Sequence, residues 1–246
     1  MTTLIVGCSY IENICIKSPD PRHVYINPNK FLLCGTSGSG NQAMAARVIH
    51  ECQFQQFDKI CVLWSGINRL DFPIGKNLHD TYPKDSDGNP KYSYVTPMGE
   101  LVWYHSGGFG LSGTSDSCPK LFQHFFSDQY RSCNRAYLSQ MTALSIITVQ
   151  SFVKANNINC QMAFIYDVDA DYTESAGYDA GYVEPGCGKL DRNAQLVSLI
   201  DWEMFVKTKP PFESGRDQKR LYDGFHPDFD FMLEWINQAF ELDLRS

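Results

Sequence analysis

Short apolar runs alternate with longer stretches of helical periodicity along most of this chain. Four runs predict buried strands: residues 4–6, 31–34, 59–65 and 161–167. The first three runs each stop at a glycine, namely Gly7, Gly35 and Gly66. Because glycine weakens a strand and permits sharp backbone turns, we expect each of these strands to end there.

The longer stretches repeat apolar residues every three or four positions and predict helices. They are residues 41–53, 134–157, 193–205 and 226–244. We expect the second helix to end at Asn156 and Asn157. In the last one, Pro227 fits the first turn of the helix.

Other segments lack a regular pattern and are rich in turn-forming residues. They include residues 167–189 and the much longer segment 71–133. A structureless segment of that length is unusual in a compact domain unless it has a function. We therefore predict that 71–133 is an irregular insertion that serves as a lid or a specificity element. Residues 207–220 are charged and contain proline, and predict a solvated loop, with a contact to an anionic substrate as the alternative.

The order of these elements predicts an α/β fold. Alternating strands and helices imply a parallel sheet with helices on both faces. The length of 246 residues suits one large domain of this class or two small ones. Ligands of such sheets bind outside the carboxyl ends of the strands, so we expect functional residues at the glycine-terminated ends.

Composition and charge exclude several classes of protein. A net charge of −7 argues against a general nucleic-acid binder, which needs a basic face. No stretch approaches the roughly 20 apolar residues that span a bilayer, and no secretory signal is visible at the N-terminus. The 9 cysteines include no C-x-x-C pair, which favours free, mostly buried thiols in a reducing compartment. These features predict a cytoplasmic protein without a membrane span.

A candidate nucleophile, Ser9, follows the first predicted strand. Cys8 precedes it and would point the other way along an extended chain, as a packing residue. A serine hydroxyl needs a base, normally a histidine that an acid orients. His226 lies in YDGFHPD, where Asp223 precedes it by three residues. In such a turn the carboxylate can bond one ring nitrogen while the other faces a serine.

Donors for a developing oxyanion are expected after the second and third strands. GTSGSGNQ places Gly38 between a strand and a helix, and WSGINRL places Asn68 after the next strand. The glycine stretch has neither the Gly-Lys-Ser/Thr ending of a P-loop nor the spacing of a dinucleotide site. A tight turn and a phosphate cradle are alternative interpretations of it.

Taken in order, these segments resemble the sequence blocks of the SGNH, or GDSL-type, hydrolases. VGCSY resembles the first block, GTSGSGNQAMAARV the second, SGINR the third and DGFHPD the fifth. The resemblance implies Ser9 as nucleophile, with Asp223 and His226 completing a catalytic triad. It also implies an oxyanion hole made by the N–H groups of Ser9 and Gly38 and the side chain of Asn68.

The resemblance covers nearly the whole chain and implies a flavodoxin-like, three-layer α/β/α sandwich with a parallel sheet. Residues 1–246 would then form a single SGNH hydrolase-like domain that carries the insertion, and no metal or organic cofactor is required. The sequence departs from the family where Cys8 and Arg69 replace its usual aspartates. Gly-Cys-Ser variants resemble members that include viral proteins, for which the host cytoplasm or the virion is the expected location.

The family implies an acyl ester as substrate, and we expect a small acyl ester or an O-acetyl carbohydrate. Trp103, Tyr104 and Phe109 of the insertion could stack on a sugar or line an acyl pocket, or form the insertion's own core. Arg69 could bind a carboxylate or phosphate of the substrate, or pair with a nearby acid.

Alternative functions come from different classes. A catalytically weak or inactive module with the SGNH fold would recognise glycans or form part of a virion, and a phosphate-handling domain would use the glycines after the second strand. The complete set of Ser9, Asp223 and His226 favours an esterase. Residues 167–178 begin like a calcium loop, but Tyr172 and Tyr178 replace the glycine and glutamate of an EF-hand.

Overall fold

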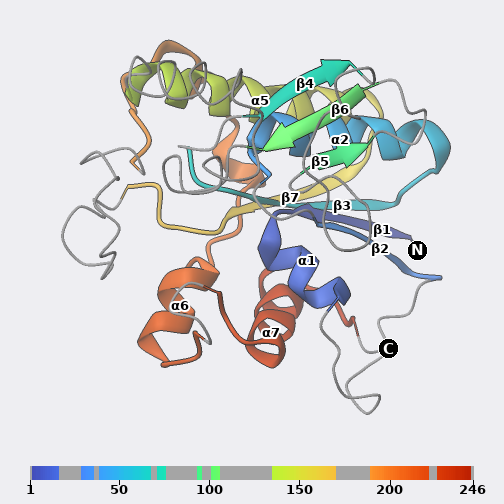
Figure 1. The fold of residues 1–246 in the computed structure, drawn as a ribbon, viewed down its shortest axis with the longest axis vertical. Coiled ribbons are helices and arrows are strands. Elements are labelled where there is room, and N and C mark those ends of the chain that lie inside the picture. The colour runs from blue at the N-terminus through green and yellow to red at the C-terminus, as the bar shows by residue number, and fades with distance from the viewer. Residues whose placement is uncertain are drawn as a thin grey trace.

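A parallel sheet of four strands forms the centre of the described part of the chain in the computed structural model (Figure 1). Side by side, the strands are β2 (Phe31–Gly35), β1 (Thr3–Gly7), β3 (Lys59–Trp64) and β7 (Asn159–Phe164). The first three strands along the chain match the predicted apolar runs closely, whereas β7 starts two residues earlier and ends three residues earlier than the predicted run 161–167. The predicted α/β class is confirmed. The structure describes residues 2–16, 29–35, 39–67, 71–75, 93–95, 101–105, 135–169, 189–221 and 226–244.

The two central strands, β1 and β3, are buried along their whole length. Continuous apolar runs suit this position because helices cover both faces of a parallel sheet. Lys59, at the start of β3, is only 6% exposed, and its amine donates a hydrogen bond to the carbonyl of Phe240. That carbonyl lies at the C-terminal end of the last helix, where a cation is favourable.

Helices lie on both faces of the sheet (Figure 1). One face carries α1 (Ser9–Ile16), α6 (Pro211–Asp217) and α7 (Phe229–Ala239), and the other carries α2 (Asn41–Phe54) and α5 (Arg135–Ala155). The chain steps from β1 outward to β2 and then returns past β1 to β3. Because crossovers between parallel strands are right-handed, this reversal puts α1 and α2 on opposite faces.

Helix α5 ends where the sequence predicts. Asn157 has a φ of 53°, a left-handed conformation that asparagine tolerates, and the Ile158 N–H donates to the Val153 carbonyl at 2.9 Å. Within the described ranges, neither this helix nor any other is long and apolar enough to cross a membrane.

A second, antiparallel sheet lies inside the segment 71–133. Its strands, in spatial order, are β4 (Asp71–Gly75), β6 (Leu101–His105) and β5 (Ser93–Val95). The prediction of an irregular segment is therefore wrong for these residues. The strands are 3 to 5 residues long and pair across a turn-rich stretch of chain, so no local period reveals them.

Residues 193–205, predicted as one helix, form two 3-10 helices instead, η1 (Gln195–Leu199) and η2 (Trp202–Met204). The interruption falls at Ile200 and Asp201, which have extended backbone. Apolar residues recur with a helical period in this stretch, but contacts with a distant part of the chain interrupt the helix.

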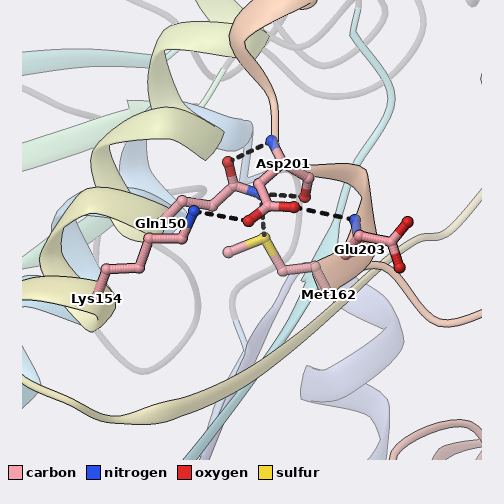
Figure 2. Close-up of polar contacts among 5 residues, drawn as sticks. All are labelled: Gln150, Lys154, Met162, Asp201 and Glu203. Carbon is pink, nitrogen blue, oxygen red and sulfur yellow. Dashed lines mark hydrogen bonds and ion pairs between the residues drawn. The ribbon is translucent and has the colours of Figure 1, made fainter.

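Gln150 of α5 supplies those contacts by binding the backbone of Asp201 (Figure 2). Its side-chain amide donates to the Asp201 carbonyl at 2.7 Å and accepts the Asp201 N–H at 3.0 Å. The Asp201 carboxylate forms a salt bridge of 2.6 Å with Lys154 and accepts the N–H of Glu203. Backbone groups that a continuous helix would pair internally are thus satisfied by a distant helix.

Two helices are absent from the prediction. Residues 207–220, predicted as a solvated loop, contain α6, with Pro211 in its first turn and Phe212 buried. The sequence pattern also does not predict α1, which starts at Ser9 and has only 8 residues. Helices this short contain too few turns for an apolar period to stand out.

The last helix is shorter at both ends than the sequence predicts. α7 begins at Phe229, and the side chain of its N-cap residue Asp228 accepts the Phe231 N–H at 2.9 Å. Pro227 therefore precedes the helix, and the prediction that it lies in the first turn is wrong. An aspartate cap competes well with proline as a start signal because it satisfies a helix N–H.

Candidate active site

Ser9 lies at the edge of the sheet where the carboxyl ends of β1, β2 and β3 meet. β1 is the strand at which the chain reverses its direction across the sheet, and ligands of open α/β sheets bind at such switch points. The residue is 7% exposed. Its hydroxyl is therefore held in a protected position at the part of the sheet where a ligand is expected.

Ser9 and His226 meet at this edge although 217 positions separate them in the sequence. Ser9 Oγ lies 2.9 Å from His226 Nε2, which is a hydrogen-bonding distance. When the imidazole carries its proton on Nδ1, Nε2 accepts the serine proton. This is the geometry that a serine nucleophile and its general base require.

Two glycines allow α1 to approach the sheet closely enough to put Ser9 there. A Cβ on Gly35, at the end of β2, would lie 2.7 Å from the Cα of Glu12 in α1. A Cβ on Gly7, at the end of β1, would collide with the side chain of Ile11. The glycines that end the strands therefore permit a close contact between α1 and the sheet, because they have no Cβ.

Cys8 lies directly before Ser9 and has a structural role. Its side chain is fully buried, which confirms the predicted packing role. Its carbonyl accepts the N–H groups of Ile11 at 3.0 Å and Glu12 at 3.1 Å, so Cys8 begins the hydrogen bonding of α1.

An aromatic side chain, Tyr10, packs against His226. The buried Tyr10 ring lies 5.3 Å from the imidazole between ring centroids, at an angle of 54°. Tyr166 packs edge-on against Tyr10 at 6.3 Å and against Phe212 at 5.0 Å. The imidazole thus adjoins the Tyr10 ring of α1, which belongs to a row of rings that continues through Tyr166, after β7, to Phe212 of α6. Sequence reasoning missed these rings. The available signal was the position of Tyr10 directly after Ser9.

The segment that carries His226 is closed at its two ends. Leu221 and Pro227 form an antiparallel bridge, and the Asp228 N–H donates to the Arg220 carbonyl at 2.7 Å. The guanidinium of Arg220 also binds the Asp228 carboxylate through two nitrogens, one of them at 2.7 Å. The described residues on both sides of His226's segment are therefore tied to each other and to the ends of α6 and α7.

Asp71 organises the turn between β2 and α2. Its buried carboxylate accepts the N–H of Gly40 at 2.8 Å and that of Ala43 at 2.9 Å. These N–H groups belong to the start of α2 and have no partner within the helix, so Asp71 caps it from a distant strand.

Asn41, the first residue of α2, connects this turn to the end of β3. Its side-chain oxygen accepts the Ser65 N–H at 2.9 Å, and its amide donates to the Thr142 hydroxyl at 3.2 Å. Asp71 and Asn41 thereby hold Gly40 and Ser65, which lie two and three positions in sequence from the predicted oxyanion residues Gly38 and Asn68. Sequence reasoning missed both Asp71 and Asn41, and a polar residue beside a glycine turn was the available signal.

The structure brings together two of the predicted catalytic residues, Ser9 and His226, whose roles stay predictions. The predicted site residues outside the described ranges are Gly38, Asn68, Arg69, Phe109 and Asp223. Trp103 and Tyr104 lie on β6, where their backbones pair with β4.

The acidic segment after β7 is engaged by an arginine. Arg192 binds both carboxylate oxygens of Asp169, at 2.9 and 2.7 Å, and this contact holds the pKa of that carboxyl below its ordinary value. The Asp167 carboxylate accepts the Asp169 N–H. These partners occupy oxygens that a calcium loop would direct at the ion. No group of three or more His, Cys, Asp or Glu suited to a metal occurs within the described ranges.

The described cysteines are free thiols. Four of them are buried and Cys52 is partly buried, which confirms the predicted packing role for the buried ones. Burial raises the pKa of Cys52 to about 11 and that of Cys160 to about 12. Such thiols stay protonated near neutral pH and are weak nucleophiles.

Comparison with known proteins adds no relative. No family model matches this sequence, and a search of curated proteins found no significant match.

Proposed function

We propose that this protein is a serine hydrolase of the SGNH type that cleaves carboxylic esters. The observation that carries the proposal is the hydrogen-bonded pair of Ser9 and His226 at the carboxyl edge of the parallel sheet. A serine becomes a competent nucleophile when an imidazole takes its proton. These two residues are also the ones that the sequence blocks single out.

The strand order supports the same proposal. Read across the sheet, β2, β1, β3 and β7 follow the beginning of the flavodoxin-like order. Phe205 makes a parallel bridge with Met162 on the outer side of β7, where a fifth strand of that order would lie. We take a three-layer SGNH hydrolase fold as the proposed fold of the domain.

In the proposed reaction, His226 Nε2 accepts the Ser9 proton while Oγ attacks the ester carbonyl. The tetrahedral intermediate then expels the alcohol, which leaves with that proton, and the acyl group remains on Ser9. Water, deprotonated by the same imidazole, attacks the acyl-enzyme, and the imidazolium returns that proton to Ser9 Oγ as the carboxylic acid is released. Asp223 is proposed to accept the Nδ1–H of His226 and to stabilise the charged imidazole.

The oxyanion of the intermediate is proposed to bind the N–H groups of Ser9 and Gly38 and the side chain of Asn68. Ser9 begins α1, and N–H groups in a first helical turn have no partner within the helix. Such donors are aimed before the reaction starts, and losing one typically costs ~10²–10³-fold in turnover.

The proposed substrate is a small acyl ester, with an O-acetyl carbohydrate as the preferred class. The proposed specificity element is the insertion 71–133, which carries the antiparallel sheet. Trp103 and Tyr104 belong to its strand β6, and aromatic side chains suit either a sugar ring or an acyl chain.

Hydrolysis of p-nitrophenyl acetate and labelling with a fluorophosphonate test the proposal. We expect turnover and labelling in the wild type. Ser9→Ala should lose both, with a fall in kcat of at least about 10³-fold, and His226→Ala should fall to a similar extent. Cys8→Ala is the matched control, because it alters the neighbouring nucleophile-type residue, and it should keep both activities.

A folded wild type without turnover or label would overturn the hydrolase proposal. The non-catalytic module would then become the leading interpretation, and binding to a glycan array would be its test. Loss of the label in Cys8→Ala together with retention in Ser9→Ala would instead reassign the nucleophile.

A further inference from the structure

Arg220 and Asp228 join the two ends of the segment that carries His226. Their contact has three parts: a backbone hydrogen bond of 2.7 Å from the Asp228 N–H to the Arg220 carbonyl, and two hydrogen bonds from the guanidinium to the carboxylate. We call this arrangement the Arg220–Asp228 clasp. Two parallel bonds between a planar guanidinium and a carboxylate fix orientation as well as distance.

One side of the clasp is held by the end of α6. The Lys219 N–H donates to the Arg216 carbonyl at 3.1 Å and the Arg220 N–H to the Gly215 carbonyl at 2.7 Å. Together with a φ of 56° at Lys219, this is the Schellman arrangement that ends many helices. A Cβ on Gly215 would lie 2.9 Å from Leu221, so α6 packs directly beneath the start of the segment.

The other side is held by the start of α7. The Asp228 carboxylate that binds Arg220 also accepts the Phe231 N–H at 2.9 Å as the N-cap of the helix. The guanidinium lies 5.7 Å from the centre of the Phe231 ring, and that residue is buried. The clasp thus attaches the two ends of the His226 segment to α6 and α7, two helices that are anchored in the core.

The two hydrogen bonds between the Arg220 guanidinium and the Asp228 carboxylate are not needed for either helix to form. Asp228 could cap α7, and Lys219 could end α6, without Arg220 reaching across. The pairing of Arg220 with Asp228 instead adds two side-chain bonds to the backbone hydrogen bond and the Leu221–Pro227 bridge, which already hold the two ends of the segment together.

We propose that the Arg220–Asp228 clasp is the positioning element that keeps His226 Nε2 at hydrogen-bonding distance from Ser9 Oγ. The expected effect on turnover rests on the proposed hydrolase function. The expected effect on the position of His226 does not. Neither residue touches the serine, so both act through the imidazole. Displacing a reacting group by about 1 Å can cost on the order of 10²-fold in rate, so a modest loosening of the turn has a large effect.

The test compares Arg220→Gln and Asp228→Asn with the wild type. Asparagine is as good an N-cap as aspartate, so Asp228→Asn removes the ion pair while it retains the cap. We expect kcat for p-nitrophenyl acetate to fall about tenfold in each variant, with KM within about twofold of the wild type. The double variant should fall no further than either single variant, because both remove one interaction. Arg220→Lys should recover part of kcat, since lysine restores charge without the planar fork.

Lys209→Gln is the matched control. It removes the exposed ion pair between Lys209 and Asp217, which also involves α6 but does not close the His226 segment. We expect its kcat to equal that of the wild type. Thermal unfolding of all variants separates a local effect from a general loss of stability.

NMR of 15N-labelled histidine gives a readout that does not depend on turnover. The His226 Nε2 resonance, assigned with His226→Ala, should shift in Arg220→Gln and Asp228→Asn and stay in place in Lys209→Gln. If the wild type neither turns over substrate nor reacts with the fluorophosphonate, the proposed function fails and the NMR comparison alone decides the inference. Unchanged kcat or an unchanged His226 resonance in the two clasp variants, with only a lower melting temperature, would overturn it.

Discussion

The backbone of Glu12 in α1 crosses directly over Gly35 at the end of β2. A Cβ on Gly35 would lie 2.7 Å from the Glu12 Cα, and closer still to its nitrogen. The obstacle is backbone, which cannot rotate aside as a side chain can. The first turn of the same helix carries Ser9, so this contact links the shape of β2 to the position of the candidate nucleophile.

Gly35→Ala should therefore both destabilise the protein and displace Ser9. We expect a loss of about 3 kcal/mol in the free energy of unfolding, because overpacking of a tight contact costs about 1–3 kcal/mol or more. Urea denaturation measures this loss. Gly215→Ala is the control, since its nearest obstacle is the end of the Leu221 side chain at 2.9 Å, which can move. Equal stability losses in the two variants would contradict this interpretation.

Asp71 should be required for the turn at the start of α2. Asp71→Ala leaves the N–H groups of Gly40 and Ala43 without their carboxylate partner. A buried donor without a partner costs about 1–3 kcal/mol, so we expect a destabilisation of about 3 kcal/mol. Asp58→Ala, which removes an exposed carboxylate that accepts the Thr2 N–H, should cost less than about 1 kcal/mol and serves as the control.

Loss of the Gln150 amide should release the connection between η1 and η2. Gln150→Leu has a similar size but cannot bind the N–H and carbonyl of Asp201. We expect a destabilisation of about 2–3 kcal/mol, measured by urea denaturation. Amide hydrogen exchange should quicken at Asp201 first. Lys154→Gln, which removes only the exposed salt bridge to the same residue, should change stability far less than Gln150→Leu, because exposed ion pairs contribute little.

The pair of Asp169 and Arg192 should contribute to stability at neutral pH but not in acid. The hydrogen bond from Arg192 lowers the pKa of Asp169 from its ordinary value of 3.8. A carboxyl whose pKa is lower in the folded state stabilises that state above its ordinary pKa. This contribution is lost as the pH falls through the lowered value.

Asp169→Asn should therefore reduce the free energy of unfolding at neutral pH, by less than about 1 kcal/mol because the pair is exposed. The difference from the wild type should vanish below the lowered pKa. Denaturation at neutral and strongly acidic pH measures both quantities. Arg192→Gln should lose at least as much, because it also removes the guanidinium that lies 4.2 Å from the centre of the Trp202 ring. In the Arg192→Gln background, Asp169→Asn should add nothing. A difference that persists unchanged in acid would argue against the ion pair as its cause.

Local pattern was sufficient for the strands of the parallel sheet and for the two long helices. The runs at β1 and β3 are apolar at nearly every position because both of their faces are covered, and this signal does not depend on any distant partner. The end of α5 was also predictable, because Asn157 tolerates the left-handed conformation that ends a helix. The candidates Ser9 and His226 came from short motifs, because serine and histidine are residue types that can act as a nucleophile and a base.

Apart from the short helices α1 and α6, the missed elements depend on partners far away in the chain. β4, β5 and β6 exist through pairing with one another across turn-rich segments, and η1 and η2 are separated because Gln150 binds Asp201. Asp71 becomes a helix cap only because β4 lies beside the start of α2. No window of sequence contains both members of such a pair.

The sequence by itself thus determined the class of fold and the kinds of side chain available for catalysis. Apolar periodicity indicates which positions are buried, and glycine indicates where the backbone can turn sharply. Both signals lie within a short stretch of sequence. Only the tertiary structure decided that Ser9 Oγ and His226 Nε2 lie 2.9 Å apart. That distance depends on Gly35 beneath α1 and on the Arg220–Asp228 clasp between α6 and α7, and contacts of this kind form only when distant segments pack together.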